Sequence, residues 1–393
     1  MQQFGGIFYV NITKDIVYVG VNDRDIDLFE GKYVVPNGMA YNSYVIFDEK
    51  IAVMDTVDAR FGEEWIGNLK RVLGDKIPSF LVIQHMEPDH SANIARFMEE
   101  FPEATVVSTD RSFVMMKQFF GKKCPARTVV AKDGDSLSLG EHTLTFVHAP
   151  MVHWPEVMVT YDAKDKVLFS ADAFGKFGTL DADEDWACEA RRYYFGIVGK
   201  FGAQAQKLIS RAKELDIEII CSLHGPILSE NLGYYIGLYD IWSKYEVESE
   251  GVVIAYTSVY GNTKKAVELL EAELVAAGCP KVVVNDLARC DMAEAVEDAF
   301  RYGTVVLATT TYNGGVFPFM REFLHELTER GYCNRRIGII ENGSWAPTAK
   351  NRIKKMLEES KNITFVEPAI TIRSAMTEQN KDEIKQLAAE LCK

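Results

Sequence analysis

Four side chains that can bind metal ions stand within six consecutive residues: His85, Glu87, Asp89 and His90. They directly follow the apolar segment 80–83, which is typical of a buried strand. Two imidazoles and two carboxylates suit iron, manganese or zinc, and they are enough ligands to begin a site for two ions. This run therefore predicts part of a dinuclear metal centre.

The simpler interpretation of the run is the start of a helix over residues 92–101. Asp89 or Ser91 would then cap that helix, and the histidines would be surface residues. This interpretation accounts for one acid but not for four potential ligands. Histidine is also scarce, with seven in 393 residues, so two histidines beside two acids favour the metal site.

Three other residues come just after apolar segments: His153, Asp172 and His224. Taken singly, Asp172 could be a turn aspartate and His224 a histidine beside a glycine turn. Their recurrence after separate predicted strands favours a role as ligands. His148 competes with His153, but its alternation with Phe146 indicates a strand residue, so we prefer His153. His142 and His325 have no such context and are not expected to bind metal.

Length and charge limit the class of protein. A chain of 393 residues and 44.2 kDa predicts two domains. A net charge of −14 and a pI near 5.1 argue against a nucleic-acid-binding protein. No apolar stretch is long enough to span a membrane and the N-terminus does not resemble a signal peptide, so we expect a cytoplasmic protein. The seven cysteines form no C-x-x-C pair, which predicts free thiols.

The pattern of elements changes near residues 246–251, where we place the boundary between domains 1–248 and 249–393. The first domain alternates strands, hairpins and helices, with hairpin turns expected at 133–135 and 162–165 and a helix at 232–245. Its strands are expected at 44–47, 51–55, 80–84, 105–108, 144–147, 157–161, 167–170 and 218–221. The second domain repeats strand, loop and helix, with strands at 252–256, 281–284, 304–308, 337–340 and 363–366. That rhythm predicts a doubly wound parallel sheet.

The first loop of the second domain could bind a phosphate group. Hydroxyls and free backbone N–H groups at a helix N-terminus form a cradle for an anion, here from Thr257, Ser258, Tyr260, Gly261, Asn262 and Thr263. The loop is neither a P-loop nor G-x-G-x-x-G. Its S-x-x-G-x-T pattern resembles the FMN phosphate loop of flavodoxins.

Two later loops fit the same cofactor, because ligands of this fold lie beyond the carboxyl ends of the strands. One contains Thr311, Tyr312, Asn313 and Gly314, and the other Asn342, Gly343, Ser344 and Trp345. The aromatic rings of Tyr312 and Trp345 could lie against a flavin. They could equally be ordinary core residues.

The ligand order of the first half, H-x-E-x-D-H followed by histidine, aspartate and histidine, resembles the metallo-β-lactamase fold. Glu87 departs from that wider family, which usually has histidine there; a carboxylate favours iron. With the flavodoxin-like second half, the chain resembles the flavodiiron proteins, or A-type flavoproteins. Segments 152–156 and 168–175 match motifs of that family. The expected fold class is α/β, an N-terminal metallo-β-lactamase-like αββα sandwich plus a C-terminal flavodoxin-like doubly wound parallel sheet.

The resemblance implies two non-haem irons and FMN. One iron would be held by His85, Glu87, His153 and Asp172, and the other by Asp89, His90, His224 and the bridging Asp172. In some members the residue matching His90 is turned away from the metal. Glu156 replaces the family's aspartate, a change that we expect to leave the ligands unaffected.

The resemblance also implies reduction of dioxygen to water, of nitric oxide to nitrous oxide, or of both. The flavin and irons of one chain lie far apart in this family, so we expect a head-to-tail homodimer or a dimer of dimers. No rubredoxin-like C-x-x-C pair is present, so a separate donor such as rubredoxin or a reduced deazaflavin is expected. Two alternatives remain: a zinc hydrolase with a flavodoxin-like appendage, and a metal-free electron carrier.

Overall fold

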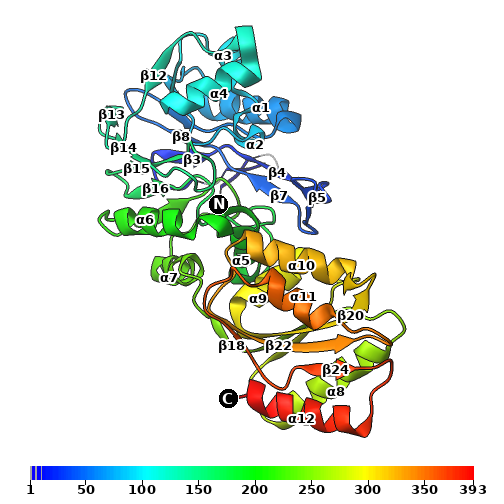
Figure 1. Cartoon of the computed structure of the whole chain (residues 1–393). Coiled ribbons are helices and arrows are strands. Elements are labelled where there is room, and N and C mark those ends of the chain that lie inside the picture. Colours follow the sequence, from blue (N-terminus) through cyan, green and yellow to red (C-terminus); the bar gives the residue numbers. More distant parts are fainter. Residues whose placement is uncertain (1, 5–6, 10) are drawn as a thin grey trace. The chain divides into compact units, whose positions relative to one another are not determined.

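The computed structural model describes residues 2–4, 7–9 and 11–393 (Figure 1). The chain divides into two compact units. The first contains the chain up to Tyr194 together with Ala203–Asp240, and the second contains Phe195–Gly202 and Ile241–Lys393. Among the described residues, no helix has the length and apolar character needed to cross a membrane.

A six-stranded sheet forms one layer of the first unit, in the order β12-β11-β10-β9-β8-β3. Strands β9 to β12 are parallel, whereas β3 and β8 are antiparallel to their neighbours. The strands are β3 Ile16–Tyr18, β8 Tyr44–Ile46, β9 Ala52–Met54, β10 Phe80–Val82, β11 Thr105–Ser108 and β12 Thr128–Val130. The helices that connect them are η1 Ala59–Phe61, α1 Gly62–Leu73, α2 Pro88–Ser91, α3 Ile94–Glu100, α4 Asp110–Phe120 and η2 Gly121–Lys123.

A five-stranded sheet forms the second layer, in the order β13-β14-β15-β16-β17. Its strands are β13 Ser136–Ser138, β14 Thr143–His148, β15 Met158–Asp162, β16 Val167–Phe169 and β17 Ile219–Cys221. A buried apolar cluster draws residues from both sheets, such as Met54 and Val82 from one and Phe146 and Phe169 from the other. The side chains that point inward from each sheet thus form one core, as in a layered sandwich.

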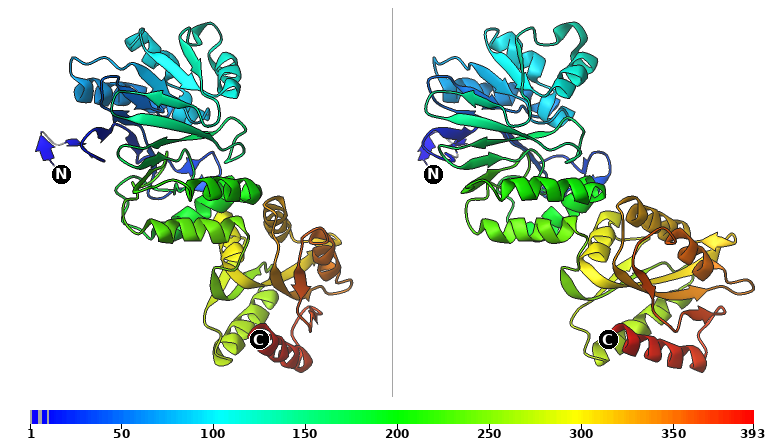
Figure 2. Two further views of the ribbon diagram at one scale, coloured as in Figure 1. Left: turned by 90° about the vertical axis from the view of Figure 1, so that its left-hand side faces the viewer. Right: turned by 60° about the vertical axis from the view of Figure 1, so that its left-hand side comes forward.

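Helices cover the outer faces of this sandwich. Figures 1 and 2 show α1, α3 and α4 over the six-stranded sheet and α6 and α7 beyond the five-stranded sheet. The remaining helices that precede β18 in the chain are α5 Trp186–Tyr193, η3 Tyr194–Val198, η4 Gly199–Phe201, α6 Gly202–Ala212 and α7 Leu232–Ser243, of which η3 and η4 fall almost wholly in the second unit. The layer arrangement is that of the expected αββα sandwich.

All eight strands predicted for this half are present, but one other expectation was wrong. The turn at 133–135 joins β12 and β13, which belong to different sheets, so it is no hairpin. The alternative to the metal site, in which Asp89 or Ser91 caps a helix, is excluded because helix α2 begins at Pro88 and contains both residues. Proline is favoured at the first helical position because its missing N–H would have no partner within the helix.

Short strands that the sequence did not predict precede β8. They are β1 Gln2–Phe4, β2 Ile7–Tyr9, β4 Val21–Asp23, β5 Leu28–Phe29, β6 Tyr33–Val34 and β7 Met39–Tyr41. Strands β5 and β6 form a hairpin with a three-residue loop, Glu30 to Lys32, in which Glu30 and Gly31 have φ values of 51° and 67° and the N–H of Lys32 donates to the carbonyl oxygen of Phe29. Positive φ at both positions is typical of a type I′ turn, which fits the twist of a two-stranded ribbon.

The second unit contains a parallel sheet in the order β19-β18-β20-β22-β23, which is strand order 2-1-3-4-5. This is the doubly wound, flavodoxin-like order. The strands are β18 Ser249–Tyr256, β19 Val282–Asp286, β20 Tyr302–Tyr312, β22 Arg335–Asn342, β23 Ile363–Phe365 and β24 Ile370–Ile372. The predicted fifth strand is divided into β23 and β24 around Pro368, which cannot donate a ladder hydrogen bond. A short strand, β21 Gly315–Val316, pairs antiparallel with the end of β20.

Helices cover both faces of the parallel sheet, with α8 and α12 on one side and α9, α10 and α11 on the other (Figure 1). Their bounds are α8 Asn262–Ala276, α9 Met292–Arg301, α10 Pro318–Glu329, α11 Ala349–Met356 and α12 Glu378–Leu391. A buried cluster joins α8 and α12 to the sheet through residues such as Leu270, Ile254 and Leu387. The expected doubly wound sheet is therefore present.

Arg335 anchors the segment that enters this sheet. Its guanidinium is 2% exposed and donates hydrogen bonds to backbone carbonyls of five residues: Tyr245, Glu246, Phe300, Cys333 and Asn334. Burial lowers the pKa of Arg335 below its usual value. The side chain thus joins the segment before β18 to the ends of α9 and β22 through carbonyl groups alone.

Replacing this arginine tests the anchor. We expect Arg335→Met to lower the free energy of opening of the parallel sheet by about 2–4 kcal/mol, because several buried carbonyls lose their donor. Hydrogen exchange at the β20 and β22 amides measures that free energy. Arg321→Met on the exposed face of α10 is the control; equal protection in the two variants would contradict the proposed anchor.

Candidate dinuclear metal centre and cofactor pocket

Four side chains of the first unit converge on one point: His85, Glu87, His153 and Asp172. The Nε2 atom of His153 lies 3.0 Å from Glu87 Oε2 and 3.0 Å from Asp172 Oδ2. The Nε2 atom of His85 lies 3.2 Å from Glu87 Oε2 and 3.3 Å from Asp172 Oδ2. Metal–ligand bonds of about 2.0–2.2 Å place neighbouring ligand atoms roughly 3 Å apart. The spacing of these four side chains therefore fits one bound ion.

A second group lies on the other side of Asp172 and consists of Asp89, His90 and His224. The two Nε2 atoms are 2.9 Å apart, and Asp89 Oδ2 lies 3.3 Å from that of His90 and 3.4 Å from that of His224. Asp172 Oδ1 faces this group at 3.6 Å from His90 and 3.8 Å from His224. One carboxylate thus presents a different oxygen to each group, which is the arrangement of a bridging ligand.

Several carboxylate oxygens of this site have no hydrogen-bond partner. Both oxygens of Asp89 and Oδ1 of Asp172 are buried without a hydrogen-bond partner among the described residues. Buried carboxylates without donors are costly unless they are paired or bind a metal ion. The chemistry of the site therefore fits two metal ions with nitrogen and oxygen ligands.

The pKa values of the first group are shifted because its acidic and basic side chains are buried close together. Burial by itself raises the pKa of Asp172, but His85 and a hydrogen bond with His153 outweigh it and hold that pKa well below its usual range. Burial lowers the pKa of His153, but Asp172 and Glu87 outweigh it and raise that pKa to about 9. Without metal, the first group thus retains protons that a metal ion would replace.

The histidines of the second group titrate in the opposite direction. Burial and the charge of His224 hold the pKa of His90 well below its usual value, and burial also lowers the pKa of His224. Both rings are therefore neutral near pH 7. Neutral imidazole is the form that binds metal.

Hydrogen bonds on the far side of two rings orient them. His85 Nδ1 lies 2.9 Å from Glu156 Oε1, and His224 Nδ1 lies 2.8 Å from the carbonyl oxygen of Ala40. A proton on Nδ1 leaves the lone pair of Nε2 directed at the site, and a carboxylate partner makes the ring a better ligand. Glu156 Oε1 also accepts from the backbone N–H of Met86. The contact between Glu156 and His85 was not evident from the sequence, and the expectation that Glu156 in place of aspartate leaves the ligands unaffected stays a prediction.

Glu30 is a neighbour of the site that the sequence did not reveal. Loss of water around its carboxyl group, followed by the charge of Glu87 and a hydrogen bond with it, raises the pKa of Glu30 to about 7. The residue as a whole keeps solvent access. The β5–β6 turn positions it, and Phe29 of the same hairpin packs edge-on against the His224 ring at 5.4 Å. The Glu30-Gly31 pair could have indicated the turn, but nothing in the sequence places it beside Glu87.

The three remaining histidines lie outside both groups. His148 ends β14, with its Nε2 atom 3.0 Å from the carbonyl oxygen of Ala131. His325 lies on α10 beside Glu329. His142, which we expected to lack any metal-binding context, is buried among acidic side chains. The sequence did not reveal this environment because the acids come from segments that are distant in the sequence.

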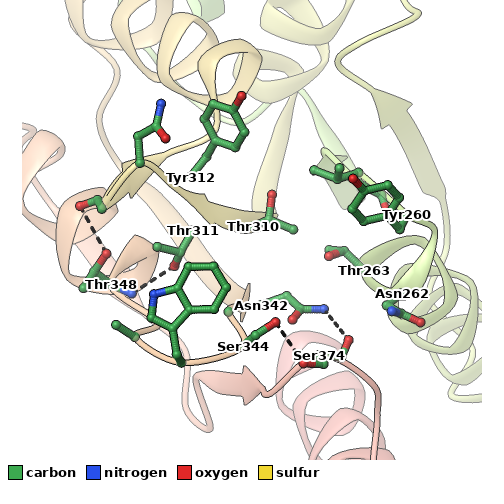
Figure 3. A pocket seen from close by; sticks show the side chains of 17 residues that line it. Tyr260, Asn262, Thr263, Thr310, Thr311, Tyr312, Asn342, Ser344, Thr348 and Ser374 are labelled. Carbon is green, nitrogen blue, oxygen red and sulfur yellow. Dashed lines mark hydrogen bonds between the residues drawn. The ribbon is translucent and has the colours of Figure 1, made fainter.

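The second unit contains a cavity of about 500 Å³ at the carboxyl ends of β18, β20 and β22 (Figure 3). Its lining includes twelve of the fourteen predicted cofactor residues: Ser258, Tyr260, Asn262, Thr263, Thr311, Tyr312, Asn313, Gly314, Asn342, Gly343, Ser344 and Trp345. The other two predicted positions, Thr257 and Gly261, do not line the cavity. The wall also contains Val259, Thr310, Ala346, Thr348 and Ser374, which the sequence did not predict. These lie beside the predicted loops, so the loops were found but their neighbours were not.

Two hydroxyl groups of this wall lack partners. Thr263 Oγ1 and Thr310 Oγ1 are buried without a hydrogen bond to any described residue, and Figure 3 shows both side chains at the cavity. Thr263 lies in the first turn of α8, where backbone N–H groups have no partner within the helix. Ser258 Oγ accepts from the N–H groups of Gly261 and Lys264, which shapes the turn and leaves its proton free to donate. These donors fit the phosphate of FMN.

Thr257 and Gly261 have structural roles instead. Thr257 Oγ1 lies 2.7 Å from Thr309 Oγ1 and is fully buried. Gly261 has φ +86° and an added Cβ atom would meet nothing within 4 Å, so glycine is needed for conformation and not for space. Tyr312 is 46% exposed and Trp345 is 89% exposed, which excludes the alternative that they are core residues.

The loops that carry these residues are fastened to one another. Thr311 Oγ1 accepts from the N–H groups of Thr348 and Ala349 and thus caps α11. Asn342 donates to the carbonyl oxygen of Ser374, whose hydroxyl in turn donates to that of Ser344. Dashed lines in Figure 3 mark the contact of Thr311 with Thr348 and those of Ser374 with Asn342 and Ser344. The cavity wall is therefore preformed.

Comparisons with known proteins agree with both halves. The family model described as ODP family beta lactamase matches residues 39–225, and that described as Flavodoxin domain matches residues 253–374. A nitric oxide reductase of Moorella thermoacetica is 30% identical over 93% of this chain and 93% of its own. An anaerobic nitric oxide reductase flavorubredoxin of Vibrio vulnificus is 29% identical over 89% of this chain and 73% of its own.

Solved structures agree over nearly the whole length. Rubredoxin:oxygen oxidoreductase from Desulfovibrio gigas is 26% identical, with a TM-score of 0.89 and 98% of each chain covered. The flavodiiron protein from Giardia intestinalis is 26% identical, with a TM-score of 0.92 over 99% of this chain and 97% of its own. The likeness therefore extends through both units.

The contact between Glu156 and His85 predicts the effect of a substitution. In Glu156→Gln the amide can still accept from His85 Nδ1–H but carries no charge, so we expect metal affinity at the first group to fall about 10- to 100-fold. Competition with a chelator measures that affinity. Asp110→Asn on the exposed start of α4 is the control. Equal affinity in both variants would show that Glu156 does not support His85.

Substitutions of Thr263 and Thr257 are expected to have different effects on FMN affinity. We expect Thr263→Val to weaken FMN binding about 10- to 100-fold, because a donor to a charged phosphate is lost. Thr257→Val should leave FMN affinity within about threefold and cost roughly 1 kcal/mol of stability, since its hydroxyl faces Thr309. Fluorescence titration of the protein with FMN measures the affinity. Weaker binding in the Thr257 variant alone would contradict this assignment.

Proposed function

This chain belongs to the flavodiiron proteins, and from that premise we propose that it is an oxidoreductase that reduces dioxygen to water, nitric oxide to nitrous oxide, or both. The cofactors are two non-haem irons and FMN. The observation that carries the proposal is the position of Asp172, whose two oxygens face two separate groups of ligands. The named activities of the relatives support it.

We assign the ligands as follows. His85, Glu87, His153 and Asp172 hold one iron, and Asp89, His90, His224 and Asp172 hold the other. FMN lies in the cavity of the second unit, its phosphate at the start of α8 beside Ser258 and Thr263 and its ring system near Tyr312 and Trp345. Residues 1–248 are then the diiron domain and residues 249–393 the FMN domain.

When bound, the ferrous pair and the reduced flavin supply two electrons each. Dioxygen needs these four electrons to become two waters. Two nitric oxide molecules need two electrons to become nitrous oxide and water. The chain contributes ligands that are mostly buried and held in place by their neighbours. His85 and His224 are held by Nδ1 hydrogen bonds, and Tyr41, Phe29 and Tyr193 pack their rings against His224. Both reductions consume protons, and the Glu30 carboxyl group lies beside Glu87, where it can take up or release one.

The competing function is a zinc hydrolase with a flavodoxin-like appendage. Glu87 argues against it, because it adds a negative charge where the wider fold family usually has an imidazole, and a carboxylate suits iron. The preformed cavity of the second unit argues against it as well. The metal content of the purified protein separates the two functions.

The assembly and the electron donor are part of the proposal. Because flavin and irons are far apart within one chain of this family, we propose a head-to-tail homodimer or a dimer of dimers. Electrons come from a separate donor, such as rubredoxin or a reduced deazaflavin. We also propose a cytoplasmic location, and the acidic net charge of −14 supports a protein without nucleic-acid partners.

The activity is tested on protein purified without oxygen. We expect about two irons and one FMN per chain, and reoxidation of the reduced flavin within seconds after mixing with dioxygen or with nitric oxide. The faster gas is the preferred substrate. Zinc in place of iron, or a flavin that stays reduced with both gases, would return the hydrolase to first place.

The dimer is tested by mixing two inactive variants. Asp172→Asn removes the bridging carboxylate, and Thr263→Glu places a negative charge where the FMN phosphate binds; we expect each alone to lose at least about 100-fold in activity. In randomly assembled head-to-tail dimers, about a quarter of the wild-type activity should return, because half of the dimers are mixed and each holds one intact pair. No recovery in confirmed mixed dimers would contradict electron transfer between subunits.

A further inference from the structure

A second group of metal-capable side chains lies in the first unit and shares no member with the diiron centre. Asp15 precedes β3, His142 lies in the β13–β14 turn and Asp165 lies in the β15–β16 turn. One ligand atom from each lies within 4.8 Å of those of the other two. Three segments that are distant in the sequence thus bring a nitrogen and two carboxylates together.

The ring of His142 is fixed and fully buried. Its Nδ1 atom lies 2.9 Å from Oδ2 of Asp162, which is also fully buried, and its backbone N–H donates to Asp48 at 2.6 Å. Its Nε2 atom has no hydrogen-bond partner among the described residues. A carboxylate on Nδ1 leaves the Nε2 lone pair free and increases its basicity, which is the usual environment of a metal-binding histidine.

The distance between His142 Nε2 and Asp15 Oδ2 is 3.7 Å. That is too long for an N–H···O hydrogen bond, so a proton on Nε2 would not join the two atoms. A metal ion fits between them, because two bonds of about 2.0–2.2 Å span roughly 3–4 Å. The geometry thus favours a metal ion over a proton as the link.

The local charge also favours a cation. Four carboxylates surround the ring, from Asp15, Asp48, Asp162 and Asp165. Lys164 is the cation that contacts this group, at 2.9 Å from Asp15 and 2.7 Å from Glu141. Its side chain is 28% exposed, so it can turn outward when a metal ion takes its place on Asp15. The hydroxyl of Thr13 donates to Asp165 and holds that carboxylate toward the group.

We propose that His142 Nε2, Asp15 and Asp165 bind one divalent transition-metal ion, such as Zn²⁺, and that Asp162 orients the histidine. One nitrogen and two oxygens suit zinc, manganese or cobalt, with water completing the coordination. The ion fastens the segment before β3, at the edge of the six-stranded sheet, to two turns of the five-stranded sheet. It is a structural site, independent of the gas chemistry.

The test uses intact protein with its irons and FMN bound. Equilibrium dialysis against Zn²⁺, followed by elemental analysis, counts the zinc held by wild type, His142→Gln and the control His148→Gln. His148 belongs to the neighbouring strand and its Nε2 faces a backbone carbonyl, so it offers the same residue type outside the site. We expect wild type and His148→Gln to hold one zinc ion per chain more than His142→Gln. Asp162→Asn should weaken that binding about 10- to 100-fold.

A second variant, Asp165→Asn, removes a ligand that lies in a partly exposed turn. It tests the site even if the substitution of the buried His142 prevents folding. It too should lose the additional zinc ion while keeping iron, FMN and flavin reoxidation at wild-type levels. Equal zinc stoichiometry in wild type, His142→Gln and Asp165→Asn would overturn the proposal. Zinc taken up by the free cysteines is the same in all variants and cancels in the comparison.

Discussion

The first unit depends on a fully buried carboxylate, Asp172, that faces histidines on two sides. An isolated buried carboxylate is costly, and its cost is offset only by charges and donors close to both oxygens. The protein meets this requirement with four imidazoles from three separate segments, each just beyond a strand. Packing of two sheets around one core brings those loops together. The position of the site is therefore a consequence of the sandwich, while its chemistry comes from the loops.

Support for the ligands is as important as the ligands themselves. Glu156 holds His85, the carbonyl oxygen of Ala40 holds His224, and the β5–β6 hairpin brings Phe29 and Glu30 to the same place.

The second unit must bind an anion, the phosphate of FMN, instead of metal cations. Among the described residues that line its cavity there is no lysine or arginine, so an anion would be bound by hydroxyls and by the start of α8. Hydrogen bonds between the loops hold that cavity open.

Sequence patterns predicted the regular parts well, because periodicity and turn residues act locally. The eight strands around the metal site, the order of the ligand-bearing loops and the doubly wound sheet could all be read in this way. The parts that were missed depend on contacts between distant segments. Neither Glu30 beside Glu87 nor His142 among Asp15 and Asp165 could be inferred from neighbours in the chain. Thr257 fits the phosphate loop by type, but its hydroxyl faces Thr309 of an adjacent strand.

The position of Asp172 between two irons is the central claim, and anomalous X-ray diffraction at the iron edge tests it most directly. The account predicts two iron peaks in each chain, one beside each oxygen of Asp172. One peak should lie among His85, Glu87 and His153, and the other among Asp89, His90 and His224. A single peak, or peaks at the zinc edge in place of iron, would contradict it.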